Sequence, residues 1–503
     1  MGYFLDGFDF NMANLLLVPI AADFGIPVIL SATLISAAYC TRWFGGMMFG
    51  AIGDRWGRKV SMVTSILLYA VGTFVCALAP AFWVLFAARL FIGLGMAGEY
   101  SSSTTYIQET WPKQYRNKAV AFVVAGFSFG GAVTAQVYKL VEYLVQGTAL
   151  EPHAWRIFFA IGILPVILAL WMRRSISEAD DYVSMRAAQE EIAKKDPNYK
   201  APVDMLTVLY RKSPRRAIIN LVCTLVSIVM LISVFLGQSS LNGWVIGFFW
   251  VFVFATIISF TVQFMKRRWP LGMAIIFLVL CCNLIGGPMQ ALWSTYLTTD
   301  LKVDTGMMAN LTSVFWIGQV IGCIVVGFLG DRWGSRKSAL VGLTCSIVVF
   351  APVFIVNHDR MAQGGVWMLI FIVFLLLYEL FIATNAVMPK YLGYYFPTSD
   401  RNAGVGFMLN VGSLGGAVAP VLVLALEASV FQPMGLGLGW TIFTIVTLFT
   451  VIVVISLAVN LPARVLSWTR PEEVREQDWA DHDITNVAEE VKAQAARAAA
   501  ENA

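Results

Sequence analysis

Long apolar runs dominate this sequence and constrain its fold. Runs of about 20 apolar residues, the length at which a helix crosses the hydrocarbon core of a bilayer, recur from the first residues to residue 460. The chain is 58% hydrophobic and 13% charged, whereas soluble domains are about 25% charged. The sequence therefore predicts an all-α polytopic membrane protein and excludes an ordinary cytosolic enzyme.

Charged breaks between the apolar runs delimit fourteen expected transmembrane helices. They lie near residues 2–22, 28–52, 60–79, 81–107, 118–145, 155–172, 216–236, 243–264, 271–297, 307–329, 338–356, 365–388, 403–430 and 438–460. Most of the 35 Lys and Arg residues follow even-numbered helices, and those that do not are Arg42, Arg89, Lys139, Arg156, Lys302 and Arg360. Short cytoplasmic loops collect Lys and Arg. We therefore expect both termini in the cytoplasm and an even number of spans.

Three sequence motifs occur twice, at almost the same offset. Residues 50–59 read GAIGDRWGRK and residues 327–337 read GFLGDRWGSRK, and GGAV stands at both 130–133 and 415–418. The third pair is a Pro four residues before an Arg, at Pro112 and again at Pro397. The repeat predicts a duplicated bundle. Its expected parts are a six-helix bundle at 1–172, a cytoplasmic loop at 173–215, two additional helices at 216–268, a second six-helix bundle at 269–462 and a cytoplasmic tail at 463–503.

The repeated loop has the chemistry of a breakable latch. Asp54 stands between two expected helices, where a carboxylate caps the next helix and accepts hydrogen bonds from Arg side chains, while Gly50 and Gly57 permit a tight turn and close packing. A charged latch suits a protein that alternates between two states; the alternative is a basic loop with a helix cap. The expected latch residues are Gly50, Asp54, Arg55, Gly57, Arg58, Glu109, Arg116, Asp331, Arg332 and Arg336.

These motifs resemble the major facilitator superfamily. The loop at 50–59 carries the most specific likeness, and RLFIGLG at 89–95 and ETWPKQYR at 109–116 also match the superfamily's pattern. The resemblance implies two six-helix halves that move substrate through a central cavity by alternating access.

Within that superfamily the chain is similar to the bacterial sialate:proton symporters. The likeness lies in YFLDGFDF at 3–10, TRWFGG at 41–46, GMAGEY at 95–100 and KRRWP at 266–270. These symporters have two extra helices between their halves, which match 216–264 here and support fourteen spans in all. The DGFD segment also resembles the aromatic acid:proton symporters, so it indicates proton-coupled acid transport more than one substrate.

Six ionisable residues lie inside expected spans, where insertion of a charge costs roughly 2.5–3.5 kcal/mol. Asp6 and Asp9 share one helix face, and two close carboxylates oppose each other's ionisation, which favours carrying a proton. For Asp6 the alternative is solvation at the cytoplasmic helix end. Glu99 is either a further proton site or a partner of Arg42. The six residues are Asp6, Asp9, Arg42, Arg89, Glu99 and Glu379.

The expected substrate-binding residues are Arg42, Arg89, Tyr39, Gln136 and Glu379. A guanidinium binds carboxylate with two parallel hydrogen bonds, which suits an acidic substrate; the alternative for each Arg is a permanent ion pair. The superfamily's pattern makes Asp9 the expected partner of Arg89. Glu379 stands where the symporter family is expected to have uncharged polar residues, and either sets substrate selectivity or is packing polarity.

Other chemistries find no support in the sequence. The three His residues lie outside the spans, the seven Cys lie in apolar runs without metal spacing, and no phosphate-binding Gly-rich loop or catalytic triad occurs. We expect no enzyme activity, cofactor, metal or nucleic-acid partner. The leading hypothesis is proton-coupled uptake of sialic acid across a bacterial inner membrane by a monomer whose partners are an acidic sugar, protons and lipid. A proton symporter of a monocarboxylate or aromatic acid is the alternative, and a non-transporting receptor that signals through its tail is a third reading.

Overall fold

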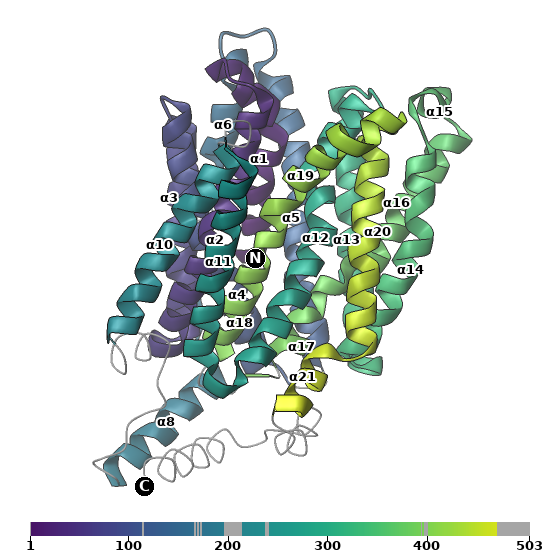
Figure 1. The fold of residues 1–503 in the computed structure, drawn as a ribbon. Helices are drawn as coiled ribbons and strands as arrows, with labels where there is room; N and C mark the ends of the chain where they lie inside the picture. Colours follow the sequence, from purple (N-terminus) through teal and green to yellow (C-terminus); the bar gives the residue numbers. More distant parts are fainter. Residues whose placement is uncertain are drawn as a thin grey trace.

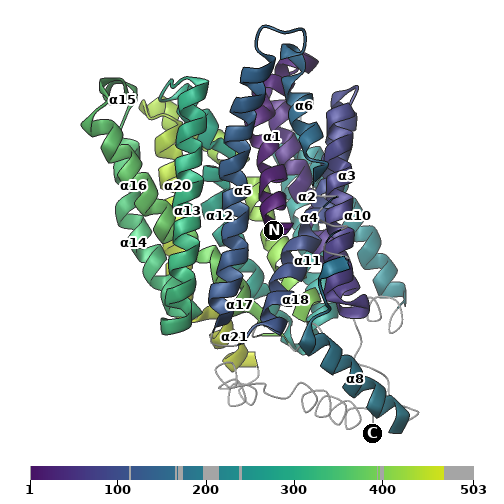
Figure 2. The same cartoon turned by 180° about the vertical axis from the view of Figure 1, so that it is seen from behind.

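The chain forms a bundle of long helices that stand side by side (Figures 1 and 2). The computed structural model describes residues 2–112, 115–164, 167, 171, 174–195, 214–236, 241–393, 395–396 and 401–469. Within these residues it contains no strand, and nine helices are long and apolar enough to cross a membrane. The predicted all-α polytopic fold is confirmed. Residues 470–503 of the expected tail and residues 173 and 196–213 of the expected loop at 173–215 lie outside the described residues.

Each of the fourteen expected ranges contains helix, with breaks at 162–163, at 387 and at 413. The N-terminal half contains α1 (Gly2–Phe24), α2 (Val28–Trp56), α3 (Arg58–Leu78), α4 (Phe82–Thr110), α5 (Arg116–Val145) and α6 (Ala154–Ile161). The two additional helices are α10 (Pro214–Leu236) and α11 (Gly243–Met265). The C-terminal half contains α12 (Trp269–Thr299), α13 (Thr305–Trp333), α14 (Ser335–Ile355), α16 (Val366–Ile382), α18 (Arg401–Gly412), α19 (Leu414–Leu426) and α20 (Leu438–Ala458). The domain limits at 172, 215, 268 and 462 remain predictions.

Several short elements lie between and beside these helices. They are η2 (Glu151–His153), α8 (Asp180–Lys195), η4 (Lys266–Arg268), α15 (His358–Gln363), η5 (Ala383–Ala386), α17 (Met388–Gly393), η6 (Glu427–Phe431), η7 (Gln432–Met434) and α21 (Leu461–Thr469). The expected helix 365–388 ends early because the chain tightens into η5. The expected helix 403–430 divides at Ser413, beside glycines that weaken a helix interior.

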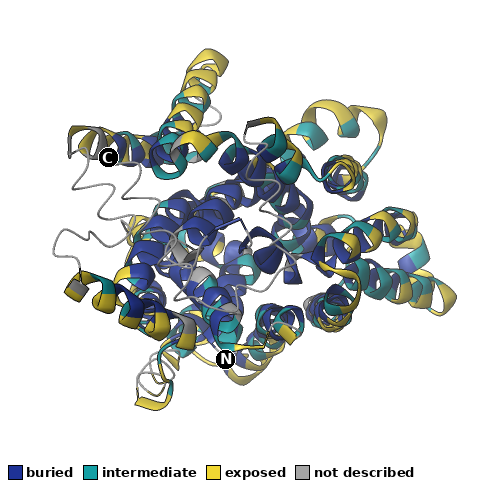
Figure 3. Cartoon of the chain, turned by 90° about the horizontal axis from the view of Figure 1, so that it is seen from below, coloured by how far each residue is buried: buried dark blue, intermediate teal, exposed yellow. Residues whose placement is uncertain are grey.

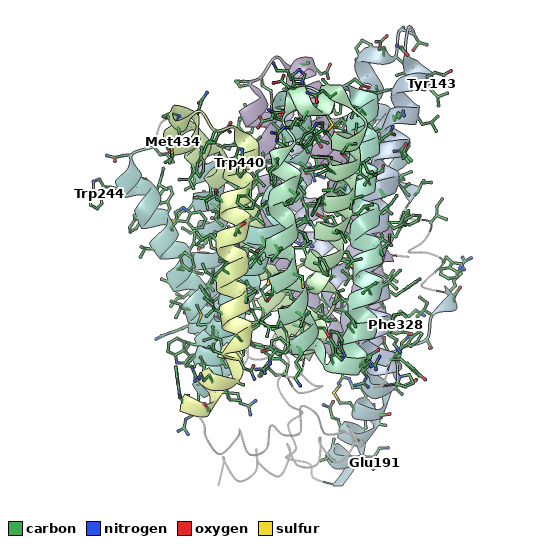
Figure 4. The ribbon with its side chains drawn as sticks, turned by 90° about the vertical axis from the view of Figure 1, so that its right-hand side faces the viewer. Tyr143, Glu191, Trp244, Phe328, Met434 and Trp440 are labelled. Atoms are coloured by element: carbon green, nitrogen blue, oxygen red, sulfur yellow. The ribbon has the colours of Figure 1, made fainter. Side chains whose placement is uncertain are left out.

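The outer surface of the bundle exposes many large apolar side chains, and its mainly apolar interior also buries polar and charged groups. Viewed from below, buried residues occupy the middle and exposed residues the rim (Figure 3). Trp244 is 87% exposed and Tyr143 74%, and both project from the outer ends of long helices (Figure 4). Glu191 marks α8, which projects below the bundle in the same view. The distribution suits a bundle whose solvent is lipid.

The two halves meet along two pairs of helices, α5 with α13 and α2 with α18 and α19. Helices α5 and α13 run in opposite directions, and polar contacts occur at several levels along the pair. Gln136 donates to the Ser313 hydroxyl over 2.7 Å near one end. In the middle the Ser128 hydroxyl donates to Gln319 Oε1 over 2.6 Å. The halves are therefore held together along most of this interface.

Backbone contact fixes α1 against α5. A Cβ on Gly7 would stand 2.1 Å from the carbonyl oxygen of Phe127, and a Cβ on Gly130 would stand 2.1 Å from that of Phe4. These distances exclude any larger residue unless one helix moves. The α1–α5 crossing therefore depends on glycine in both helices, as in other close helix pairs in membranes.

We expect Gly130→Leu to lower the free energy of unfolding by about 1–3 kcal/mol, because the new side chain forces α1 away from α5. Thermal unfolding of the purified protein in detergent, followed by tryptophan fluorescence, measures the effect. Gly247→Leu on α11 is the control, since a Cβ there meets nothing within 4 Å. Equal melting temperatures for the two variants would contradict the proposed crossing.

Candidate functional site

A central cavity lies between the halves and has three adjoining lobes. The Arg42 lobe is the largest, at about 120 Å³. The Glu379 lobe adjoins it through Cys282, Gln290 and Gln319, which line both. An outer lobe, which also reaches Gln290, is lined by Asn11, Asn14, Trp316 and neighbouring residues. Helices of both halves contribute to the walls, so a bound molecule would contact both halves.

An aromatic cluster surrounds Arg42 on α2. The guanidinium carbon lies 5.9 Å from the ring centre of Phe10 and 5.7 Å from that of Tyr39. Tyr3 stacks on Tyr100 at 5.0 Å in the same lobe. A guanidinium held by aromatic faces keeps its donors directed elsewhere, which suits a planar carboxylate in the cavity.

Asp6 on α1 connects Arg42 with an acidic cluster inside the N-terminal half. Asp6 is fully buried, and its charge interacts with those of Arg42, Glu99 and Asp9. Neither of its oxygens has a hydrogen-bond partner within the described chain. The alternative that Asp6 is solvated at a helix end is therefore wrong. The buried hydroxyl of Tyr69 on α3 is in the electrostatic range of all three carboxylates.

Asp9 on α1 is fully buried beside Thr73 of α3 and Arg89 of α4. The Thr73 hydroxyl donates to its Oδ2 over 2.6 Å, and Arg89 is the cation that acts on it. Among the described residues, none of the three guanidinium nitrogens of Arg89 makes a hydrogen bond. Asp9 and Arg89 are thus neighbours without a direct hydrogen bond, and Arg89 lies behind the cavity wall.

Glu99 on α4 is 1% exposed and is not joined to Arg42 by an ion pair. Its Oε1 accepts a hydrogen bond from Ser103 over 3.2 Å, and Gly2 packs directly against it. The structure therefore does not form the expected contact between Glu99 and Arg42. The role of Glu99 as a proton site remains a prediction.

Glu379 on α16 lines its own lobe of the cavity and is 1% exposed. Its Oε2 has no hydrogen-bond partner within the described chain. Close packing brings it there, since a Cβ on Gly318 of α13 would stand 2.9 Å from the Cβ of Glu379. Glu379 is a buried carboxylate that faces the cavity from the C-terminal half.

The five expected substrate-binding residues are not all in the cavity. Tyr39 and Arg42 line the Arg42 lobe and Glu379 lines the next, whereas Gln136 is engaged with Ser313 between the halves. The sequence did not single out several lining residues because nothing in a helical periodicity says which polar face meets the other half. These residues are Tyr3, Phe127, Ser128, Cys323 and Ser413.

The N-terminal copy of the repeated loop forms a buried ionic network. Gly57 turns the chain at φ 108°, and Arg58 follows it, fully buried. The Arg58 side chain binds Glu109 through two hydrogen bonds of 2.9 Å and Asp54 through one of 2.6 Å. The paired geometry is the strong, bidentate kind. This network joins the cytoplasmic ends of α2, α3 and α4.

Helix α8 covers this network, which the sequence did not predict. Glu178, just before α8, accepts hydrogen bonds from the backbone N–H groups of Arg58 and Lys59 and so caps α3. Tyr182 donates to the carbonyl of Arg55 over 3.0 Å, and Arg186 donates to the same carbonyl.

The C-terminal copy of the loop faces the other half instead. Gly334 turns the chain at φ 86°, and Ser335 takes the place that Arg58 has in the first copy. Asp331 accepts hydrogen bonds from the N–H groups of Asn117 and Lys118, at 3.1 and 3.2 Å, in the first turn of α5. A carboxylate at a helix N-terminus is stabilised by the helix dipole. Asp331 therefore joins the halves at their cytoplasmic end.

The other expected latch residues have separate positions. Arg116 donates to the carbonyl of Trp111, Arg332 is exposed, and Arg336 lies within electrostatic range of Tyr391 and Tyr395. Gly50 is buried within α2. The latch roles of these residues remain predictions.

Comparison with known proteins shows the family to which this chain belongs. A family model described as Major Facilitator Superfamily matches residues 1–294 and 276–495. The sialic acid transporter NanX of Escherichia coli (strain K12) is 30% identical over 92% of this chain and 93% of its own length. The chain belongs to the major facilitator superfamily. The resemblance to its sialate transporters, seen in the sequence, is confirmed.

Two further comparisons are more distant. The gentisate transporter of Corynebacterium glutamicum is 21% identical and covers 83% of this chain and 77% of its own length. A solved structure of XylE, a proton:xylose symporter, has a TM-score of 0.66 and 14% identity over 91% of this chain and 93% of that one. This major facilitator protein is thus a multi-pass transporter and not an enzyme.

We expect Asp331→Asn to open the cytoplasmic end more often, because the amide loses the charge that binds the α5 N-terminus. A loss of about 1 kcal/mol corresponds to about fivefold. In a variant whose single cysteine is the cavity residue Cys323, a charged thiol reagent added to inside-out vesicles should react about fivefold faster. Asp359→Asn in exposed α15 is the control. An unchanged rate, or equal acceleration in the control, would exclude a latch at Asp331.

Proposed function

We propose that this protein takes up sialic acid together with protons across a bacterial inner membrane. The observation that carries the proposal is Arg42, which faces the cavity while its charge also interacts with the buried carboxylate of Asp6. The likeness to NanX supports sialic acid as the substrate and the inner membrane as the location.

Coupling follows when Arg42 is shared by two carboxylates. With Asp6 ionised, Arg42 already has a counter-charge, and a substrate carboxylate would bring a second anion into a dry site. With Asp6 protonated, Arg42 is available to the substrate. Proton binding and substrate binding therefore favour each other by the same free energy, as linkage requires. That reciprocity is what a symporter needs.

Asp9 and Glu99 extend the proton site into the N-terminal half. Asp6 interacts electrostatically with both, and Asp9 with Arg89 behind them. A proton that leaves Asp6 thus has neighbouring carboxylates to receive it. Thr73 holds Asp9 in a fixed orientation, so Asp9 acts with Arg89 as the inner end of this series.

Alternating access follows from the paired contacts between the halves. Breaking the Asp331 contacts with α5 opens the cytoplasmic end, whereas breaking the Gln136–Ser313 contact opens the opposite end. The protein works as a monomer in this scheme, because both halves belong to one chain.

A proton symporter of another organic acid is the second candidate. The gentisate relative favours it, as does Glu379, which departs from the uncharged residue expected in sialate carriers. Gentisate and a simple monocarboxylate therefore serve as competitors in the assay below. Competition by either at lower concentration than sialic acid would reverse the order of the two candidates.

Proteoliposomes with an acidic exterior should accumulate labelled sialic acid, and a protonophore should abolish the accumulation. Arg42→Lys should lower uptake about tenfold or more, because a compact ammonium cannot make the two parallel hydrogen bonds of a guanidinium. Arg156→Lys is the control, since Arg156 binds Asp23 and the Ala79 carbonyl away from the cavity. Uptake that ignores the protonophore would count against proton coupling.

Replacing the acidic residues should separate coupling from binding. In the wild type, sialic acid should bind more weakly as pH rises and Asp6 ionises, whereas Asp6→Asn should bind with little pH dependence. Asp6→Asn and Asp9→Asn should both lose uphill accumulation and retain exchange of labelled for unlabelled substrate. Binding by isothermal titration at several pH values and counterflow in liposomes measure these effects.

The control for this pair is Asp23→Asn, whose carboxylate is partly exposed and binds Arg156. It should accumulate substrate normally. If Asp9→Asn still concentrates substrate with normal pH dependence, Asp9 does not carry the coupled proton, and Glu99 becomes the candidate for that role.

A further inference from the structure

Side chains of opposite charge line adjoining lobes of the central cavity. Arg42 reaches it from α2 in the N-terminal half and Glu379 from α16 in the C-terminal half. Gln290 and Gln319 line both lobes and so connect them. A molecule that fills both lobes meets a cation at one end and a carboxylate at the other.

Glu379 has the properties of an acceptor that lacks a partner in its own protein. It is 1% exposed, its Oε2 makes no hydrogen bond, and no basic side chain of the described chain acts on it. A buried polar group without a partner is costly, and a buried charge more so. Packing alone would be served as well by Leu or Gln, so the carboxylate calls for a ligand that donates hydrogen bonds.

The rest of the Glu379 lobe favours hydroxyl groups as that donor. Its polar lining is neutral, with the amides of Gln290 and Gln319 and the hydroxyl of Thr384 beside Glu379. Amides and hydroxyls both donate and accept, which matches the mixed hydrogen bonding of a polyol. Glu379 is the single acidic residue in the lining of this lobe.

We propose that the cavity recognises its substrate at two ends, with Arg42 binding the anionic group and Glu379 accepting hydrogen bonds from hydroxyl groups at the far end. This inference rests on the proposed transport of sialic acid and adds a specificity residue to it. The transported acid must then carry hydroxyls remote from its carboxylate. Because its two ends contact different halves, the bound acid also draws the halves together.

Two substitutions and two ligands test this proposal. Glu379→Leu removes the acceptor, and Glu379→Gln keeps one acceptor oxygen without the charge. The ligands are N-acetylneuraminate and its analogue shortened at the hydroxyl-bearing side chain by mild periodate oxidation and borohydride reduction. Isothermal titration of purified protein in detergent gives the four dissociation constants, with the wild type as reference.

We expect Glu379→Leu to bind N-acetylneuraminate about tenfold or more weakly, since a buried hydroxyl group would then be left without its acceptor. The same variant should bind the shortened analogue as the wild type does. Glu379→Gln should lose only a few-fold with N-acetylneuraminate, because its carbonyl still accepts. A loss in Glu379→Gln as large as in Glu379→Leu would overturn the hydroxyl assignment and indicate a charge-dependent contact.

Controls separate the failure of this inference from other failures. Glu427→Leu and Glu427→Gln, at a carboxylate beyond the end of α19, should bind both ligands normally. Unchanged melting temperature and retained binding of the shortened analogue show that Glu379→Leu is folded. If the wild type binds N-acetylneuraminate and Glu379→Leu binds it equally well, the inference is wrong and the proposed function stands. If the wild type binds neither ligand, the proposed function itself fails.

Discussion

The candidate site is organised by the electrostatic interaction between Arg42 and Asp6, which have no direct hydrogen bond between them. Both groups lie in the interior of a bundle surrounded by lipid, where an isolated charge has a high free-energy cost. Arg42 reaches the cavity, and Asp6 is fully buried behind it. The pair therefore connects the cavity wall, where a ligand could bind, with the buried interior of the N-terminal half. Glu99 and Asp9 interact electrostatically with Asp6 on its inner side, and Arg89 is the cation that acts on Asp9.

The two halves are duplicates in fold but differ in chemistry. In the N-terminal copy of the repeated loop, Arg58 turns inward to Glu109, while in the C-terminal copy Asp331 turns outward to the first turn of α5. At the position equivalent to Arg58 the second copy has Ser335, whose short side chain donates to Asn117 of the other half instead. The N-terminal copy is thus a brace within its half, and the C-terminal copy makes contacts between the halves.

Much of the fold was predictable because a helix that crosses the hydrocarbon core of a bilayer needs about 20 mostly apolar residues. Each apolar run became helix, and GAIGDRWGRK and its second copy became equivalent turns at Gly57 and Gly334. The site was less predictable. Buried charges such as Asp6 stood out in the sequence, but the engagement of Gln136 with Ser313 depends on how the halves meet, which no local pattern contains. Helix α8 was missed because its residues are polar and its docking depends on Tyr182 and Glu178 contacts distant in sequence.

The hydrogen bond between Ser128 and Gln319 lies between the contacts that close the two ends of α5 and α13. In a rocking motion, displacement grows with distance from the axis, so a bond near mid-length stretches least. In such a motion this hydrogen bond would lie near the axis of rotation, and the two ends of the helix pair would move most. Each end is held by only a few of the described hydrogen bonds, so small changes in free energy at either end would decide which end opens. Ser128 and Gln319 also line the cavity, so a ligand bound there would lie beside this central hydrogen bond and could shift the balance between the two ends with little movement of its own.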